Sequence, residues 1–298
     1  MTELATKETV PFIEGLHFGE SPRWHEGRLW YADFYAGSVL SASASGDVRV
    51  ELEVPGEPAG LGWLPDGRLL VVARKPRTLH RVEPDGRLVL HGDLNPTAGF
   101  YGNDMVVDAA GRAYVGNFGF DLDGFIEERG QAALVEPPGP PTTALIRIDP
   151  DGSAHIAAED LSFPNGSVIT PHGKTLIVAE TLAGRLTAFD IDDDGELTGR
   201  RVWASPSWCA PDGICLDADG NIWVANAITN ECMLVAEGGD VVERVSTSQN
   251  CFACMLGGDD RCTLYVMTAP TSTESVVSAT RTARIEQVRV KVGGAGLP

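Results

Sequence analysis

The segment WLPDGRLLVVA, residues 63–73, decides the fold of this chain because its pattern recurs along most of the sequence. It joins an Asp-Gly turn to a short apolar strand, as one half of a β-hairpin does. Five further segments share this pattern: WHEGRLWYAD (24–33), VDAAGRAYVGN (107–117), TPHGKTLIVAE (170–180), LDADGNIWVAN (216–226) and LGGDDRCTLYVMT (256–268). The turn positions Gly27, Gly67, Gly111, Gly173, Gly220 and Asp260 are 40, 44, 62, 47 and 40 residues apart. A period of about 40 to 50 residues is typical of the blades of a β-propeller.

A second hairpin follows in most repeats, as in RTLHRVEPDGRLVLHG (77–92) and TALIRIDPDGSAHIAA (143–158). Two hairpins per repeat predict a four-stranded antiparallel blade, and six repeats predict an all-β, six-bladed propeller. We expect residues 1–298 to form this single domain. A ring must close to avoid open strand edges, and the last blade has a short outer strand. The segment TVPFIEGL, residues 9–16, is therefore predicted to pair with the last blade.

Composition and charge exclude several classes of function. The formal net charge is −19, and the 23 Lys and Arg residues are thinly spread, which argues against nucleic acid and anionic membranes as partners. No stretch has the length of a membrane span, and the N-terminus lacks a signal-peptide pattern. The six cysteines include one unaccompanied C-x-x-C, so we expect reduced thiols. These features predict a cytoplasmic protein, and they imply no protein partner.

One repeat is longer than the others. The 62-residue spacing between Gly111 and Gly173 places the surplus at residues 118–143, between the two hairpins of blade 3. Four prolines in this segment preclude a regular strand. Long insertions in compact domains are commonly functional loops, and this one follows the innermost hairpin of its blade. We therefore predict that residues 118–143 form a lid beside the mouth of the ring.

The repeat register also locates a candidate site. Eight residues before the turn glycine stand Asn103 in blade 3, Asn165 in blade 4 and Asp212 in blade 5, and seven residues before Gly27 stands Glu20. The equivalent positions in blades 2 and 6 are Ala59 and Phe252. Because every innermost strand starts near the axis, these side chains should be neighbours. The register thus predicts four oxygen-bearing side chains on one side of the axis and apolar ones on the other.

Carboxylate and amide oxygens without His or Cys suit a hard cation such as Ca²⁺, Mg²⁺ or Mn²⁺. Two close carboxylates would otherwise repel each other and raise a pKa, which a divalent cation would relieve. The alternative is that Asn165-Gly166 and Asp212-Gly213 are ordinary turn dipeptides. The alignment of four such residues in one register favours a site.

Four segments, in this order, resemble the senescence marker protein/regucalcin/gluconolactonase family of calcium-type lactonases: FGESPRW (18–24), FPNGSVIT (163–170), APDGICLDADGNIWVAN (210–226) and CFACMLGGDDRCTLYVMTA (251–269). The resemblance implies one divalent cation, Ca²⁺ first with Mg²⁺, Mn²⁺ or Zn²⁺ as alternatives, held by Glu20, Asn165 and Asp212. It further implies Asp212 as the general base, Asn103 in contact with the substrate or a water, and a small-molecule lactone as the substrate. Ring opening of a lactone in the manner of a gluconolactonase is the expected reaction.

One position departs from that family. Its sugar lactonases often carry an Arg two residues before the Asn of blade 3, where this chain has Tyr101 in GFYGNDM. An aromatic face in place of a charged donor points to a less polar or differently shaped lactone. Among the aromatic residues near the mouth, we expect Tyr101 and Phe120 to contact the substrate.

Two other functions are compatible with these residues. A phosphotriesterase-like hydrolase would use the same cation to polarise a P=O bond, and substrate profiling separates it from a lactonase. A non-catalytic calcium-binding propeller would retain the ligands without the reaction, so changing Asp212 would not affect lactone hydrolysis.

Overall fold

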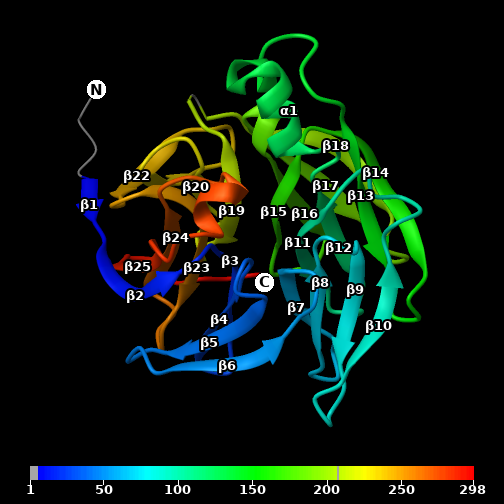
Figure 1. Cartoon of the computed structure of the whole chain (residues 1–298), viewed down its shortest axis with the longest axis horizontal. Coiled ribbons are helices and arrows are strands. Elements are labelled where there is room, and N and C mark those ends of the chain that lie inside the picture. The colour runs from blue at the N-terminus through cyan, green and yellow to red at the C-terminus, as the bar shows by residue number, and fades with distance from the viewer. Residues whose placement is uncertain (1–5, 207) are drawn as a thin grey trace.

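The computed structural model describes residues 6–206 and 208–298, and it confirms a six-bladed propeller of four-stranded antiparallel sheets around a central axis (Figure 1). Blade 1 holds β3 (Gly19–His25), β4 (Arg28–Asp33), β5 (Ser38–Ser43) and β6 (Val48–Glu53). Blade 2 holds β7 (Pro58–Trp63), β8 (Leu69–Ala73), β9 (Thr78–Val82) and β10 (Leu88–Asp93). Blade 3 holds β11 (Gly102–Val107), β12 (Ala113–Asn117), β13 (Thr143–Ile148) and β14 (Ala154–Leu161). Blade 4 holds β15 (Pro164–Ile169), β16 (Thr175–Glu180), β17 (Arg185–Ile191) and β18 (Leu197–Ala204).

Blades 5 and 6 complete the ring with help from the N-terminal residues. Blade 5 holds β19 (Pro211–Leu216), β20 (Ile222–Asn226), β21 (Glu231–Val235) and β22 (Val241–Ser246). Blade 6 holds β23 (Asn250–Gly257), β24 (Thr263–Ala269) and β25 (Ala283–Arg289), and its fourth strand is β2 (Val10–Leu16). β2 pairs antiparallel with β25, which confirms the predicted closure. A further strand that the sequence did not predict, β1 (Thr6–Glu8), pairs parallel with β22 at the outer edge of blade 5.

The innermost strands pack against one another with little space between their backbones. Every residue of β11, β15 and β19 is buried. A methyl group added at Gly166 of β15 would lie 2.6 Å from the Ile214 nitrogen and 2.7 Å from the Asp212 oxygen of β19. Such distances are far below van der Waals contact, so only glycine fits here. Glycine therefore lets neighbouring blades meet at the axis.

The insertion of blade 3 leaves between β12 and β13, as the spacing predicted, and it contains the helix α1 (Leu122–Arg129) and the 3₁₀ helix η1 (Gln131–Leu134). The Asp121 side chain caps α1 by accepting a hydrogen bond from the Gly124 N–H. Two short elements lie in other loops, the 3₁₀ helix η2 (Thr181–Ala183) and the helix α2 (Glu274–Val277). Among the described residues, no helix has the length and apolarity needed to cross a membrane.

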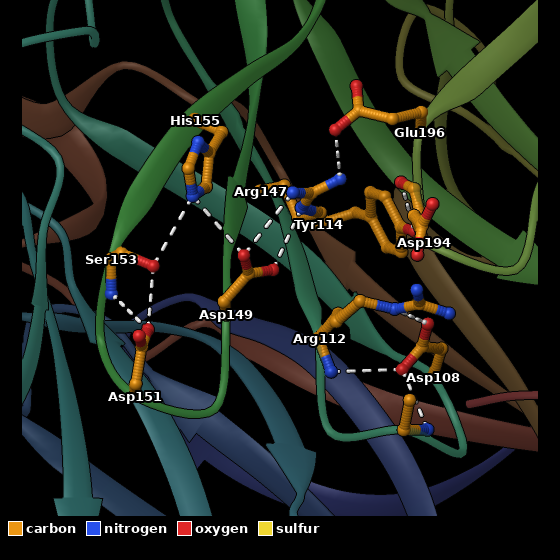
Figure 2. A network of polar contacts seen from close by, with 12 residues as sticks. Asp108, Arg112, Tyr114, Arg147, Asp149, Asp151, Ser153, His155, Asp194 and Glu196 are labelled. Carbon is orange, nitrogen blue, oxygen red and sulfur yellow. Dashed lines mark hydrogen bonds and ion pairs between the residues drawn. The ribbon is translucent and has the colours of Figure 1, made fainter.

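The end of the ring opposite the start of the innermost strands is held by polar contacts and by the C-terminal residues. Figure 2 shows the Arg147 guanidinium of blade 3 between Asp149 and Glu196, with Arg147 Nη1 at 2.7 Å from Glu196 Oε1 of blade 4. The Tyr114 hydroxyl donates to the Gly195 carbonyl across the same boundary at 2.9 Å. Near the C-terminus, Leu297 forms an isolated antiparallel β-bridge with Ile169, the last residue of β15. These contacts lie away from the starts of the innermost strands, where the candidate site is found.

Candidate active site

Each innermost strand has an irregularity in its pairing near its start, where the register predicted the site residues. The shifts fall between Glu20 and Arg23, Pro58 and Leu61, Gly102 and Met105, Pro164 and Ser167, Pro211 and Ile214, and Cys251 and Ala253. A β-bulge bends a strand and redirects its side chains. The repeated bulge therefore gives six blades the same means of directing one side chain towards the axis.

The structure brings the four predicted oxygen-bearing residues together. Glu20, Asn103, Asn165 and Asp212 all line a cavity of about 930 Å³, and each is at most 8% exposed. Phe252 of blade 6 lines the same cavity, while Ala59 of blade 2 is fully buried. The polar and apolar sides of the axis are thus arranged as the register predicted.

The Asn-Gly and Asp-Gly pairs are not turns. Asn165 and Gly166 lie within β15, and Asp212 and Gly213 lie within β19. A methyl group at Gly213 would lie 2.6 Å from the Ala253 Cβ of β23. Gly166 and Gly213 follow the site residues because the innermost strand of the next blade comes too close for a side chain. The interpretation of these pairs as turn dipeptides is therefore wrong.

The two carboxylates stand in an unfavourable environment. Burial raises the pKa of Glu20 well above its ordinary value, and the negative charges of Asp212 and Asp104 raise it further. Burial also raises the pKa of Asp212, with a further contribution from Asp104, while the Asn165 side chain acts in the opposite direction. The Ser21 N–H donates to Glu20 Oε2 at 2.9 Å and partly stabilises its charged form. Positive charge is the missing component of this cluster.

Asp104 differs from the other two acids because it has a cation of its own. Its Oδ1 lies 2.5 Å from Arg23 Nη2, and both side chains are almost fully buried. Arg23 also donates from Nε to the Leu61 carbonyl at 2.9 Å and from Nη2 to the Met105 carbonyl at 2.6 Å. Arg23 is therefore bound by Asp104 and the backbone, and the lowering effect of its charge on the pKa of Glu20 is smaller than the raising effects of burial and of Asp212.

The donor set fits a hard divalent cation. Asp212 Oδ1 is buried and has no hydrogen-bond partner among the described residues, so it is available as a ligand. Asn165 uses its Nδ2 to donate to Thr181 Oγ1 at 3.2 Å, which leaves its oxygen available as a ligand. No three His, Cys, Asp or Glu side chains gather into a metal-binding group in the described part of the chain. A cation here would rely on two carboxylates together with amide oxygens, as the sequence predicted.

The predicted substrate contacts have different positions. Tyr101 lines the cavity, and its ring packs against Phe100 with centroids 4.1 Å apart. Phe120 is not among the lining residues, because its ring packs against Phe125 at 5.3 Å and against Phe163 at 6.1 Å. Contact between Phe120 and a substrate stays a prediction, and the ring stands next to Phe163, which does line the cavity.

The sequence reasoning missed Arg74, which follows β8 and lines the cavity. Its guanidinium lies over the rings of Phe34, Tyr35, Tyr101 and Phe118, at 5.2, 5.6, 5.0 and 5.6 Å from their centroids. Arg74 falls outside the register used to find the site, because it stands at the end of the second strand of its blade. Its position relative to the innermost strands could have been found only by applying the same register to every second strand.

The fold and the cavity together define a six-bladed propeller with an oxygen-rich, partly aromatic site at one end of its axis. The chain belongs to the SMP-30/Gluconolactonase/LRE-like family, whose model matches residues 18–270.

Individual relatives resemble nearly the whole chain. It is 28% identical over 261 residues to a pentonolactonase, XacC, of Haloferax volcanii, covering 84% of this chain and 81% of that protein. It is 25% identical over 256 residues to a 6-deoxy-6-sulfogluconolactonase of Pseudomonas putida, covering 83% and 82%. The solved structure of a calcium-binding protein, regucalcin, from Agrobacterium tumefaciens has a TM-score of 0.78 at 20% identity, covering 99% of both chains. That structural likeness concerns the fold.

Proposed function

We propose that this protein hydrolyses a lactone with the help of one divalent cation, Ca²⁺ first and Mg²⁺, Mn²⁺ or Zn²⁺ as alternatives. The observation that carries the proposal is the pair of buried carboxylates, Glu20 and Asp212, which face one cavity together with Asn103 and Asn165. The lactonases among the relatives support the choice of substrate class. The substrate would be a small molecule bound in the cavity of about 930 Å³.

Glu20, Asn165 and Asp212 would hold the cation. Once bound, a divalent cation polarises a lactone carbonyl and stabilises the negative charge that develops on its oxygen. Asp212 would accept the proton of the attacking water on Oδ1, which has no hydrogen-bond partner in the part of the chain that the structure describes. Asn103 and Tyr101 would orient the lactone, because both line the same cavity as this carboxylate.

We further propose that residues 118–143 act as a lid on the single domain formed by residues 1–298. Helix α1 contributes Leu122, Ile126 and Glu127 to the cavity wall, and η1 contributes Gln131 and Leu134. A cover at this place would exclude bulk water from the reacting groups. A cytoplasmic location stays a prediction from the sequence.

The test is a hydrolysis assay with a pH indicator on chelator-treated protein, with each of the four cations added back singly. Cation-restored hydrolysis of a lactone supports the proposal, and the absence of any cation-dependent lactone hydrolysis would contradict it. A neutral phosphotriester belongs in the same assay, because turnover of the phosphotriester alone would indicate a phosphotriesterase. Binding of Ca²⁺ with no turnover of either substrate would indicate a calcium-binding propeller.

A further inference from the structure

The cavity has an unusually aromatic wall on the side of blades 1 to 3. Of the 21 Phe, Trp and Tyr residues in the chain, eight line this one cavity, and all of these except Phe163 and Phe252 belong to blades 1 to 3. Four of them surround the Arg74 guanidinium, and we call Arg74 with Phe34, Tyr35, Tyr101 and Phe118 the aromatic clamp. Phe34 and Tyr35 follow the end of β4 in blade 1, whereas Tyr101 and Phe118 flank β11 and β12 in blade 3. Arg74, which belongs to blade 2, therefore contacts aromatic rings of both neighbouring blades, 1 and 3.

The arginine of the clamp forms ion pairs with two carboxylates. Arg74 contacts Glu57 through Nε and Nη2, with 2.9 Å between Nε and Glu57 Oε2, and Arg74 Nη2 lies 3.3 Å from Glu274 Oε2. Lys75 Nζ lies 2.6 Å from Glu57 and 2.8 Å from Glu274. Two cations and two carboxylates thus balance one another. Arg74 orients the rings by cation–π contacts without adding net positive charge to the cavity.

The remaining charge of the cavity is negative. Six carboxylates line it in the described part of the chain, and Arg74 is the one cationic side chain that does so. A divalent cation would offset Glu20 and Asp212, and Glu274 is paired with Arg74 and Lys75. Asp121, Asp123 and Glu127 of the blade 3 insertion are left to repel an anionic ligand.

We propose that the aromatic clamp is the specificity subsite of the proposed lactonase. It would select a neutral lactone that carries a flat aromatic or apolar substituent, and it would disfavour lactones that carry a carboxylate or sulfonate. The inference rests on the proposed function for the reaction itself, while the choice of substrate rests on the rings and charges of the cavity. Arg74 is a positioning residue in this scheme, and Tyr101 provides a contact surface.

The test compares three six-membered lactones on the cation-restored protein: dihydrocoumarin, D-glucono-1,5-lactone and 6-deoxy-6-sulfo-D-glucono-1,5-lactone. We expect kcat/KM for dihydrocoumarin to exceed that for gluconolactone by about tenfold or more, the size of effect that one apolar contact surface gives. The sulfonated lactone should be the poorest of the three. Raising the salt concentration should reduce only the discrimination against the sulfonate, because screening acts on charge.

Variants separate recognition from folding. Tyr101→Ala and Arg74→Met should lower kcat/KM for dihydrocoumarin about tenfold more than for gluconolactone, mainly through KM. Arg74→Lys keeps the charge and should recover part of the loss. Arg147→Met is the matched control, because its guanidinium is also buried but lies at the opposite end of the ring, and it should leave the substrate preference unchanged.

A binding measurement keeps the inference independent of turnover. The lactam 3,4-dihydroquinolin-2-one resembles dihydrocoumarin but resists hydrolysis, and calorimetry should show binding that Tyr101→Ala weakens. Better hydrolysis of gluconolactone or of the sulfonated lactone than of dihydrocoumarin would overturn the inference and leave the lactonase intact. An equal loss of kcat on all lactones in the clamp variants would also overturn it. Failure to hydrolyse any lactone would instead contradict the proposed function.

Discussion

Replacing Asp212 by Asn tests the central feature of the site, a buried carboxylate of which one oxygen, Oδ1, has no hydrogen-bond partner among the described residues. The change keeps the shape of the side chain and removes its negative charge and its ability to accept a proton. Asp212 Oδ1 has no hydrogen-bond partner, and the residue is 8% exposed. In the metal-free protein the charge of Asp212 is opposed by burial and by Asp104, so its removal should relieve a conflict.

Two effects of opposite sign are expected for Asp212→Asn. The metal-free protein should gain about 1–2 kcal/mol in the free energy of unfolding, as is common when a residue kept for function is replaced. Lactone hydrolysis should fall by about 10²- to 10⁴-fold, the contribution typical of a general base. Stabilisation by added Ca²⁺ should decrease as well, because the cation loses a charged ligand.

Asp104→Asn is the matched control, since Asp104 is equally buried but is paired with Arg23 at 2.5 Å. Breaking a buried pair leaves an unpaired cation and should cost about 3–5 kcal/mol. The assay is urea unfolding of both variants and the parent protein in chelator, followed by repetition in Ca²⁺. If Asp212→Asn destabilised the metal-free protein as much as Asp104→Asn does, our account of the site as a pair of unneutralised carboxylates would be refuted.

Three further changes test the surrounding structure. Glu180 is fully buried with Arg185 Nε at 2.8 Å and the Ser162 N–H at 2.9 Å, and the pKa of its carboxyl is lowered by these contacts despite burial. Its charged form therefore stabilises the fold above the pKa of the unfolded state, and this stabilisation is lost as the pH falls through the folded pKa. Glu180→Gln should lower the free energy of unfolding by about 2 kcal/mol at pH 7 and make stability less dependent on pH below pH 5. An unchanged dependence on acid would contradict this account of Glu180. Gly166→Ala should lower the free energy of unfolding by about 1–3 kcal/mol and reduce turnover, because the added Cβ would clash with the backbone of Asp212. A crystal structure of the variant would show whether β19 has moved. Arg147→Met should lower the free energy of unfolding, measured by thermal unfolding, by about 1–2 kcal/mol and leave turnover unchanged. A loss of turnover would contradict the separation of this end of the ring from the end that holds the cavity.

Much of the site could be located from the sequence because the repeats give equivalent positions in the six blades. The innermost strands start at the same end of the ring, so residues seven or eight positions before the turn glycine meet at the axis, as Glu20, Asn103, Asn165 and Asp212 do. The same counting correctly placed the insertion between β12 and β13. It did not indicate the β-bulges, which depend on how two strands pair and not on which residues alternate.

Side-chain contacts between different blades could not be predicted from the sequence. The sequence did not show that the ring of Phe120 packs against Phe125 and Phe163, because that contact depends on how the insertion folds. Arg74 lies in blade 2 and contacts rings of blades 1 and 3, which are 39 and 40 residues before it and 27 and 44 residues after it in the sequence. No local pattern of apolar and polar residues records such a meeting.

The sequence by itself determined the number of blades, the closure of the ring by residues 9–16 and the oxygen-bearing residues at the axis, because all three follow from a period that hydrophobic strands and glycine turns make visible. Tertiary structure alone decided which charges are neutralised and which are left without a partner. Asp104 and Asp212 are both buried acids at the start of an innermost strand, yet only Asp104 has Arg23 beside it. Burial and pairing depend on distances between blades, and these are fixed only when the ring is formed.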